Sequence, residues 1–332
     1  MLSNNSVVVD WVEDGSFPFT KSITAYSKEE WQSIGTKNSK LGKLYTIHFA
    51  FQLFLHRKEC KKMVCWQQMH GIIFAFFCRL FHVKKTVDLT VMTFIYKEKS
   101  GFLGKLYKRF IGFAATSCYI DRIICYSKNE CQYYADYFQA DRNKFYNTVL
   151  GMPDASDGYQ IEAKLPTKEG GGYLFAVGRS NRDYPFMVRA LKNQPYKSII
   201  ADRTYNGEAG NCIVRKDVHY GKELYDLLSK SYCVIIPLDD MNISAGQTVF
   251  LQAMMFGKPI IVTGTNTTGE YVVDGYNGIV IRKKEEELVE AVEKLVKDPD
   301  YYRQISRNGK KMFLEHFTTE SLGRSVAEII YQ

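Results

Sequence analysis

Several features that mark common classes of protein are missing from this chain of 332 residues. It contains no low-complexity tract and no repeat of fixed period, which excludes fibrous and repeat architectures. Its most apolar stretch, residues 72–77, is short and is soon followed by Arg79, so it cannot span a bilayer. The first residues lack the charged and then apolar pattern of a signal peptide. We therefore expect a cytoplasmic protein.

Paired cysteines and metal-binding motifs are also missing. The eight cysteines form no CxxC pair, and the six histidines show no ligand spacing with them. Several cysteines lie inside apolar runs, for example Cys125 and Cys233. We therefore expect small core residues in a reducing compartment rather than a disulfide framework or a metal site.

Acidic residues are scarce in the N-terminal half, and this scarcity sets the charge of the chain. Residues 1–150 hold 21 Lys or Arg and 12 Asp or Glu, a net charge of +9, whereas the remainder holds 23 and 24, a net charge of −1. A basic half favours an anionic partner, such as lipid headgroups, a phosphorylated acceptor or nucleic acid. No nucleic-acid module is recognisable, so nucleic acid is not an expected partner. The alternative is a basic face that is only solvated.

What the chain does contain is an alternation of short apolar runs and helical patterns. Runs rich in β-branched residues predict strands, most clearly at residues 173–177, 198–201, 233–237 and 260–262. The same alternation recurs less regularly before residue 150. The expected fold class is α/β, with two Rossmann-like doubly wound domains, residues 1–152 and 153–317, facing a central cleft. A helix over residues 318–332 is expected to return to the first domain.

A polar segment follows the strand predicted at residues 173–177. It contains Gly178, Arg179, Asn181, Arg182 and Asp183. The carboxyl ends of parallel strands are where α/β sheets bind ligands, and the guanidinium fork suits phosphate oxygens. The segment therefore predicts a phosphate site, with the aspartate holding one arginine. The alternative is a surface turn in which Arg182 and Asp183 neutralise each other.

A second segment, with small residues at the start of a helix, follows the strand predicted at residues 233–237. It includes Ser244, Gly246, Gln247 and Thr248, and Gln252 lies on the same helix face as Thr248. A helix start presents amide N–H groups and the positive end of the helix dipole, which together suit a diphosphate. The glutamine can reach a ribose hydroxyl. The alternative is simple N-capping by the serine or the threonine.

These segments carry a resemblance to the retaining family-4 glycosyltransferases of GT-B fold. The C-terminal part of the resemblance is the more specific one, and residues 1–60 hardly take part. The matching stretches are Gly178-Arg179, Ser244-Ala-Gly-Gln-Thr-Val-Phe-Leu-Gln252-Ala-Met254, Gly257-Lys-Pro-Ile-Ile-Val262 and Glu270-Tyr-Val-Val-Asp-Gly-Tyr-Asn-Gly278.

The resemblance implies a role for each matching position. Arg179 would contact the donor diphosphate, and Arg182 would replace a lysine that the family often carries. The amides of Gln247 and Thr248 would bind the phosphates. The nucleobase would lie at residues 218–220, which include His219 and Tyr220.

The chain departs from the family at three places. The family's histidine after a first-domain strand is absent, since Val91-Met-Thr-Phe94 stands there, and the glycine-rich loop after the first strand is not found. The third departure concerns the donor site. Ser244 and Gln252 occupy the positions of two glutamates that the family separates by seven residues. The glutamine can still bond a ribose, whereas the serine is too short to act on the donor sugar as a glutamate does. Asp239 or Asp240 is a candidate to compensate.

Two features of the N-terminal half concern the acceptor. His70 follows a predicted strand and can act as a base toward an acceptor hydroxyl, although a histidine at a helix start is often structural. Residues 96–110 interleave Lys and Arg with aromatic and aliphatic residues, a pattern typical of a surface that meets an anionic membrane. An ordinary solvated helix remains the alternative.

The expected function is transfer of a hexosyl group from a UDP- or GDP-linked donor to a glycan or lipid-linked acceptor. The resemblance implies retention of configuration, and cell-surface polysaccharide or glycoconjugate synthesis at the inner face of the membrane. The two arginines and the helix start would stabilise the leaving diphosphate, so no metal is required and no cofactor is expected beyond the sugar nucleotide. The alternatives are a non-catalytic subunit that binds sugar nucleotides and a GT-B-fold sugar-nucleotide epimerase.

Overall fold

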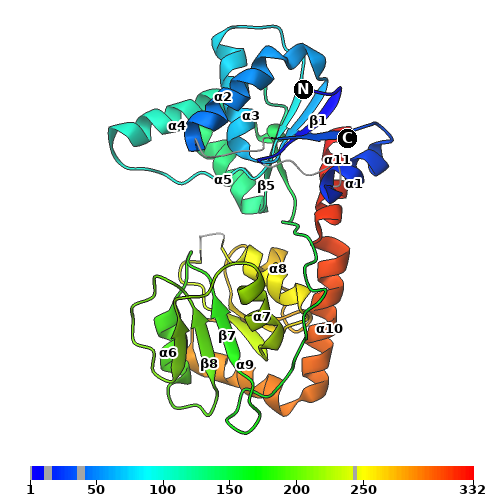
Figure 1. The fold of residues 1–332 in the computed structure, drawn as a ribbon. Helices are drawn as coiled ribbons and strands as arrows, with labels where there is room; N and C mark the ends of the chain where they lie inside the picture. The colour runs from blue at the N-terminus through cyan, green and yellow to red at the C-terminus, as the bar shows by residue number, and fades with distance from the viewer. Residues whose placement is uncertain (1, 11–16, 36–41, 242–244) are drawn as a thin grey trace. The chain divides into compact units, whose positions relative to one another are not determined.

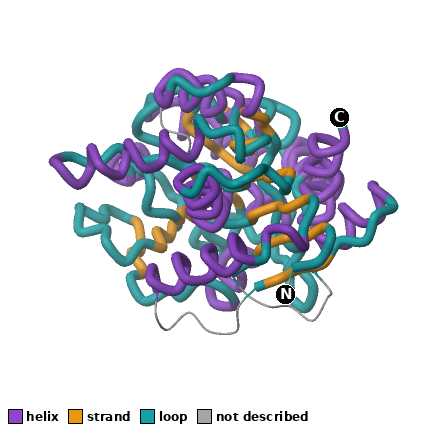
Figure 2. The backbone as a smooth tube through the Cα atoms, turned by 90° about the horizontal axis from the view of Figure 1, so that it is seen from above, coloured by secondary structure: helices purple, strands orange, loops and turns teal. Residues whose placement is uncertain are grey.

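The computed structural model describes residues 2–10, 17–35, 42–241 and 245–332. The chain forms two compact units (Figure 1). Unit 1 comprises Met1–Val149 and Thr319–Gln332, and unit 2 comprises Leu150–Thr318. Helices and strands alternate along most of the chain in both units. Figure 2 marks the helices in purple and the strands in orange. In the part of the chain that the structure describes, no helix is both long and apolar enough to cross a membrane.

Unit 1 is built on a parallel six-stranded sheet with the order β2-β1-β3-β4-β5-β6. Its strands are short and, apart from the edge strands β2 and β6, mostly buried. They are β1 (Asn5–Val8), β2 (Gln32–Ile34), β3 (Lys62–Cys65), β4 (Asp88–Val91), β5 (Arg122–Cys125) and β6 (Phe145–Asn147).

The helices of unit 1 cover both faces of this sheet. They are α1 (Pro18–Ser27), α2 (Gly42–Leu55), α3 (Gln68–Leu80), α4 (Gly101–Ala115), α5 (Lys128–Phe138) and the C-terminal α11 (Thr319–Tyr331). Because parallel crossovers are right-handed, the strand order places α2, α3 and α4 on one face and α1 on the other. There α1 packs closely against α11. Gly323 of α11 allows this approach, since a Cβ at that position would lie 2.7 Å from the carbonyl oxygen of Phe19.

Unit 2 repeats this architecture with a different strand order, β12-β11-β10-β7-β8-β9, again all parallel. Its strands are β7 (Leu174–Val177), β8 (Ser198–Ala201), β9 (Cys212–Arg215), β10 (Cys233–Ile236), β11 (Ile260–Thr263) and β12 (Ile279–Ile281). Its helices are α6 (Tyr184–Leu191), α7 (Lys222–Lys230), α8 (Gln247–Met255), α9 (Glu285–Lys297) and α10 (Pro299–His316). All residues of β7, β10 and β11 are buried, as expected of strands covered on both faces.

The predicted fold class, a doubly wound α/β architecture repeated in two domains, is confirmed. Helix α1, strand β2 and helix α10 have no counterpart among the elements expected from the sequence. The cysteines are free, and most are buried as predicted, but Cys118 is exposed and Cys131 is only half-buried.

Candidate functional site

The candidate site of unit 2 begins where the strand order reverses. Strand β10 lies beside β7, although β8 and β9 separate the two in sequence. From β7 the chain winds outward through β8 and β9, and from β10 it winds the other way through β11 and β12. In such sheets the loops at the carboxyl ends of the two central strands diverge and leave a crevice that binds ligands. Residues 178–183 belong to the first of these loops, and residues 237–241 and 245–246 are the described parts of the second.

Asn181 joins the two loops. Its side-chain Nδ2 donates to the carbonyl oxygen of Asp240 at 2.9 Å, and its Oδ1 accepts from the Asp240 amide at 2.7 Å. Its backbone has a φ of +54°, in the left-handed region that asparagine tolerates better than most residues. The structure therefore gives Asn181 a clear part in positioning the second loop, and donor binding by this residue stays a prediction.

The two predicted phosphate-binding arginines differ in their surroundings. Nε of Arg182 donates to the carbonyl oxygen of Val177 at 3.2 Å, and Nη1 donates to that of Ser180 at 2.7 Å. Its guanidinium lies against Gly178, where a Cβ would be 2.5 Å from Nη2, and burial lowers the pKa of Arg182. Arg179, in contrast, is exposed. The guanidinium of Arg182 therefore supports the loop, whereas that of Arg179 is available to a ligand.

Asp183 does not hold either arginine. Its Oδ1 accepts from the Phe186 amide at 3.0 Å and so caps α6, while its Oδ2 lies 2.6 Å from Nζ of Lys283. The prediction that this aspartate holds one arginine is therefore wrong, and so is the alternative in which it neutralises Arg182.

Lys283 is a residue of the site that the sequence did not reveal. It lies between β12 and α9, and its Nζ is 2.6 Å from Oδ1 of Asp239 as well as from Asp183. Hydrogen bonds to Asp183 and then Asp239 raise the pKa of Lys283. The lysine thus connects three loops at the carboxyl edge of the sheet. Because Asp239 is engaged there, it is poorly placed to replace the family's glutamate.

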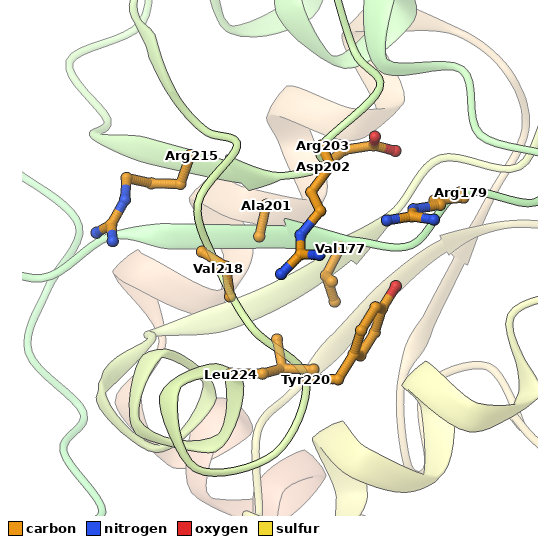
Figure 3. Close-up of a pocket in the computed structure, with 9 residues that line it drawn as sticks. All are labelled: Val177, Arg179, Ala201, Asp202, Arg203, Arg215, Val218, Tyr220 and Leu224. Atoms are coloured by element: carbon orange, nitrogen blue, oxygen red, sulfur yellow. The ribbon is translucent and has the colours of Figure 1, made fainter. Parts of the chain in front are cut away.

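A pocket opens at the carboxyl ends of β7, β8 and β9 (Figure 3). Aliphatic side chains form one part of it and three arginines another. The lining residues are Val177, Arg179, Ala201, Asp202, Arg203, Arg215, Val218, Tyr220 and Leu224. Figure 3 shows Arg179 and Arg203 pointing to the side on which the Tyr220 ring lies, while Arg215 points away. The pocket thus combines an apolar floor, an exposed aromatic ring and two cationic groups.

Arg203 is a second residue that the sequence did not reveal. It lies within a turn that is fixed by the buried Asp202, whose Oδ1 accepts from the amides of Thr204 at 2.6 Å and Tyr205 at 3.1 Å. Nη2 of Arg203 lies 2.8 Å from Nδ1 of His219. His219 therefore contacts a pocket residue although it does not line the pocket itself, whereas the predicted Tyr220 does line it.

Arg215 is neutralised within its own loop. Its guanidinium lies 2.7 Å from Oδ1 of Asp217 and 3.2 Å from Oε1 of Glu223. Oε2 of the same glutamate accepts from the amide of His219 at 3.0 Å. These contacts brace the loop that carries Tyr220.

The start of α8 has the conformation that the small residues favour. Gly246, the residue before the helix, has a φ of +96°, and its carbonyl oxygen accepts from the Phe250 amide at 2.9 Å. Thr248 is exposed, Gln247 is half-buried and Gln252 is buried. Within the described residues no side chain caps this helix, and Ser244 lies outside those residues.

His70, the predicted acceptor base, lies in unit 1 in the first turn of α3, just after β3. It is 3% exposed, and its Nε2 is 3.6 Å from Oδ1 of Asp10, at the end of β1. Burial lowers the pKa of His70, and the charge of Asp10 partly opposes this shift. The imidazole is therefore neutral at neutral pH and able to accept a proton. Asp10 was not expected from the sequence.

Among residues 2–10, 17–35, 42–241 and 245–332, no three His, Cys, Asp or Glu side chains gather in an arrangement that could hold a metal ion.

The C-terminal part of the chain is similar to known proteins. Residues 163–312 match the family described as Glycosyl transferases group 1. The chain is also 30% identical over 151 residues to an uncharacterized glycosyltransferase of Methanocaldococcus jannaschii. That alignment covers 43% of this chain and 42% of the relative, so it spans less than half of either protein.

Solved structures resemble the chain over its whole length. Anabaena Alr3699/HepE, in complex with UDP and glucose, superposes with a TM-score of 0.64 at 11% identity and 100% coverage of both chains. Sucrose-phosphate synthase from Thermosynechococcus elongatus gives 0.65 at 10% identity, covering 100% of this chain and 99% of that one. WaaG, a glycosyltransferase involved in lipopolysaccharide biosynthesis, gives 0.60 at 14% identity, with 98% and 99% coverage.

These likenesses establish the fold of the chain, and residues 163–312 of unit 2 are similar to the group 1 glycosyltransferases. The predicted resemblance to glycosyltransferases of GT-B fold is thereby confirmed: the chain has that fold, and its residues 163–312 match the family Glycosyl transferases group 1.

Proposed function

We propose that this chain transfers a hexosyl group from a UDP- or GDP-linked donor to a glycan or lipid-linked acceptor, with retention of configuration. One observation carries the proposal. Within a group 1 glycosyltransferase domain, a pocket at the carboxyl edge of the sheet combines Arg179, Arg203 and the ring of Tyr220 above an apolar floor. Anionic phosphates and a flat nucleobase are the ligand parts that such a pocket suits.

The donor diphosphate would lie between the loop after β7 and the start of α8. Arg179 supplies an exposed guanidinium on one side, and the helix that begins after Gly246 supplies the positive end of its dipole on the other. Asn181 bonds the two loops to each other, which supports their acting on one ligand. Tyr220, which is 65% exposed, would stack on the nucleobase.

The chemistry follows from the charges that develop during transfer. The bond between the anomeric carbon and the phosphate oxygen breaks, and the acceptor hydroxyl oxygen forms the new bond to that carbon. Negative charge accumulates on the leaving diphosphate, where Arg179 and the α8 amides stabilise it. The hydroxyl proton passes to a base, for which the neutral His70 is our candidate. Arg182 contributes through the loop that it supports.

The acceptor side is assigned to unit 1 and to the inner face of a membrane. The net charge of +9 in residues 1–150 favours binding to an anionic membrane surface. The process in which we place the enzyme is the synthesis of cell-surface polysaccharide or glycoconjugate. Association with vesicles rich in anionic lipid should weaken as salt is raised, because salt screens the attraction. Sedimentation with vesicles at low and high salt measures this, and equal binding at both would contradict the assignment.

A non-catalytic nucleotide-binding subunit is the second candidate, because serine and glutamine stand where the family has two glutamates. The epimerase is less favoured, since the one carboxylate of the pocket, Asp202, is occupied by the turn that it caps.

A panel of sugar nucleotides tests the proposal. Thermal unfolding measured with UDP, GDP and their glucose and N-acetylglucosamine derivatives should show stabilisation by one nucleotide series. Slow release of the free nucleotide from the preferred sugar nucleotide, quickened by the acceptor, then identifies a transferase. Stabilisation without release would favour the binding subunit, and no stabilisation by any member would refute the donor site.

A further inference from the structure

Unit 1 carries an apolar groove that the proposed donor site does not use. Two adjoining pockets open over helices α2, α3 and α4 and share Phe76, Tyr107 and Phe110, so they form one continuous groove. Beside it, the first turn of α4 exposes large apolar side chains, with Phe102 80% and Leu103 77% exposed. Large contiguous apolar patches on a protein surface often mark a site that binds a ligand, a membrane or another protein.

The groove begins at the carboxyl edge of the unit 1 sheet. Gln67, which lines it, lies two residues after the end of β3 and caps α3, and Met69, which also lines it, lies in the first turn of that helix. From there the groove follows α4 as far as Phe113. Leu103 and Phe113 are ten residues apart on one helix, which corresponds to about 15 Å. The groove therefore extends from the edge at which His70 lies toward the far side of the helical layer.

The charge around the groove has one sign. Helices α2, α3 and α4 contain no aspartate and no glutamate. Lys99 and Arg109 both line the groove, and Nζ of Lys99 lies 4.4 Å from the centre of the Tyr107 ring. The neighbouring Glu98 instead accepts a hydrogen bond from the hydroxyl of Tyr137 at 2.7 Å. An apolar channel with cationic groups along it is complementary to a hydrocarbon chain with an anionic head.

We infer that this groove binds the hydrocarbon chain of a lipid-linked acceptor whose head carries a phosphate. The chain lies against Phe76 and Phe110, and the phosphate lies near Lys99, at the end of the groove closest to the carboxyl edge. The sugar beyond the phosphate would then reach toward His70. This inference rests on the proposed function, of which it names the acceptor class, and it commits to a single lipid chain as the occupant.

Alkyl phosphates of increasing length test the inference without knowledge of the natural acceptor. Octyl, decyl and dodecyl phosphate, each kept below its micelle concentration, are titrated into the full chain by calorimetry. Saturable one-to-one binding is expected, with an affinity that rises about fourfold for each added methylene that is buried. Decyl maltoside, which has the same chain and a neutral head, should bind more weakly.

Two sets of variants separate the chain from the head. Leu103 and Leu106 of α4 both line the groove and are exposed. The double variant Leu103→Ser with Leu106→Ser should weaken the binding of decyl phosphate at least tenfold, and its melting temperature should not change, because neither side chain is buried. Leu314→Ser, an exposed leucine on α10 of unit 2, is the matched control and should leave binding unchanged. Lys99→Gln should reduce the preference for decyl phosphate over decyl maltoside about tenfold.

Several outcomes would overturn the inference. They are an affinity independent of chain length, full binding by the double serine variant, and binding to anionic vesicles without saturable binding of a single chain, which would make the surface a membrane contact only. Self-association that the double variant abolishes, with no alkyl phosphate binding, would assign the groove to a second copy of the chain. UDP stabilisation of each variant is measured in parallel, so that failure of the groove and failure of the donor site are told apart.

Discussion

Arg179 and Arg182 lie three residues apart, yet only one of them is open to a ligand. The guanidinium of Arg182 is directed at backbone carbonyl oxygens of its own loop, whereas Arg179 lines the pocket. A guanidinium that already donates hydrogen bonds to backbone carbonyl oxygens would have to break them in order to bind a phosphate with the same N–H groups. The electrostatic part of donor binding should therefore depend mainly on Arg179.

Replacing Arg179 by alanine should weaken UDP binding about tenfold or more, because a charge-assisted contact to phosphate is lost. Calorimetric titration with UDP measures the effect. Arg303→Ala removes an exposed arginine of α10 outside the pocket and should bind UDP as the parent chain does. Equal affinities for the two variants would remove Arg179 from the site.

Lys258 is a buried lysine of unit 2 and lies between α8 and β11. It is 2% exposed, its Nζ donates to the carbonyl oxygen of Glu162, and burial lowers the pKa of Lys258 to about 8. An unfolded lysine titrates near 10.4, so between pH 8 and 10.5 the unfolded chain binds more protons than the folded one. The contribution of this lysine to the free energy of unfolding therefore rises with pH across that window.

Comparison with Lys258→Met isolates this effect from other titrating groups. Relative to the variant, the parent chain should gain about 2–3 kcal/mol in unfolding free energy between pH 7.5 and 10.5. Urea denaturation at a series of pH values measures the difference. Lys192→Met removes an exposed lysine and is the control. The difference in unfolding free energy between this variant and the parent chain should not change with pH. A flat profile for Lys258→Met as well would show that the buried amine keeps an ordinary pKa.

At the scale of the element, the start of α8 depends on one glycine. Gly246 has a positive φ, and a Cβ there would lie 2.8 Å from the ring of Phe250. Gly275 also has a positive φ, of +71°, but a Cβ there would meet nothing within 4 Å. At both positions a side chain would strain the backbone, because φ is positive. Only at Gly246 would the side chain also clash with a neighbour.

Gly246→Ala should lower the free energy of unfolding by about 2–3 kcal/mol, and Gly275→Ala by about 1 kcal/mol. Only the first should also weaken UDP, by fivefold or more, since it displaces the amides proposed to bind the diphosphate. Urea denaturation and UDP titration of both variants provide the test. Unchanged UDP affinity in Gly246→Ala would separate α8 from the donor site.

The elements that the sequence predicted are those with strong local patterns. Buried strands such as β7, β10 and β11 are continuous apolar runs, and α9 has a clear amphipathic period. Helix α1 and strand β2 were missed because their residues are mixed in polarity. Helix α1 packs against α11, which is distant in sequence, and β2 is an edge strand that pairs only with β1 in the sheet.

The same distinction applies to the candidate site. The segments after β7 and before α8 could be predicted because short motifs carry them. Arg203 and Lys283 could not, because neither belongs to a motif and each becomes part of the site only through contacts between separate loops. The engagement of Arg182 with its own backbone was likewise invisible, since a residue type does not reveal where its donors point.

At the scale of the whole molecule, the last helix belongs to the first unit. Helix α11 packs against α1, the indole of Trp31 donates to the hydroxyl of Tyr331 at 3.2 Å, and Nε of Arg122 donates to the carbonyl oxygen of Ile329 at 3.0 Å. Unit 1 therefore depends on residues from both ends of the chain.

Gly323→Val should destabilise unit 1 by about 2–3 kcal/mol, because the added side chain meets the backbone of α1. Calorimetry with and without UDP resolves the two units, since a ligand raises only the transition of the unit that binds it. The valine should lower the transition that UDP leaves unmoved. Glu328→Ala, on the exposed side of α11, is the control. If the valine instead lowered the melting temperature of the transition that UDP raises, and left the other transition unchanged, the assignment of α11 to unit 1 would be contradicted.

The return of α11 has a consequence for biosynthesis. Because Leu150–Thr318 is inserted between the two parts of unit 1, the ribosome must translate all of unit 2 before α11 can emerge. At ordinary elongation rates this takes roughly 10–30 s. Throughout that delay the nascent first sheet keeps one hydrophobic flank uncovered, where chaperones and proteases can reach it, while the segment made later can already fold.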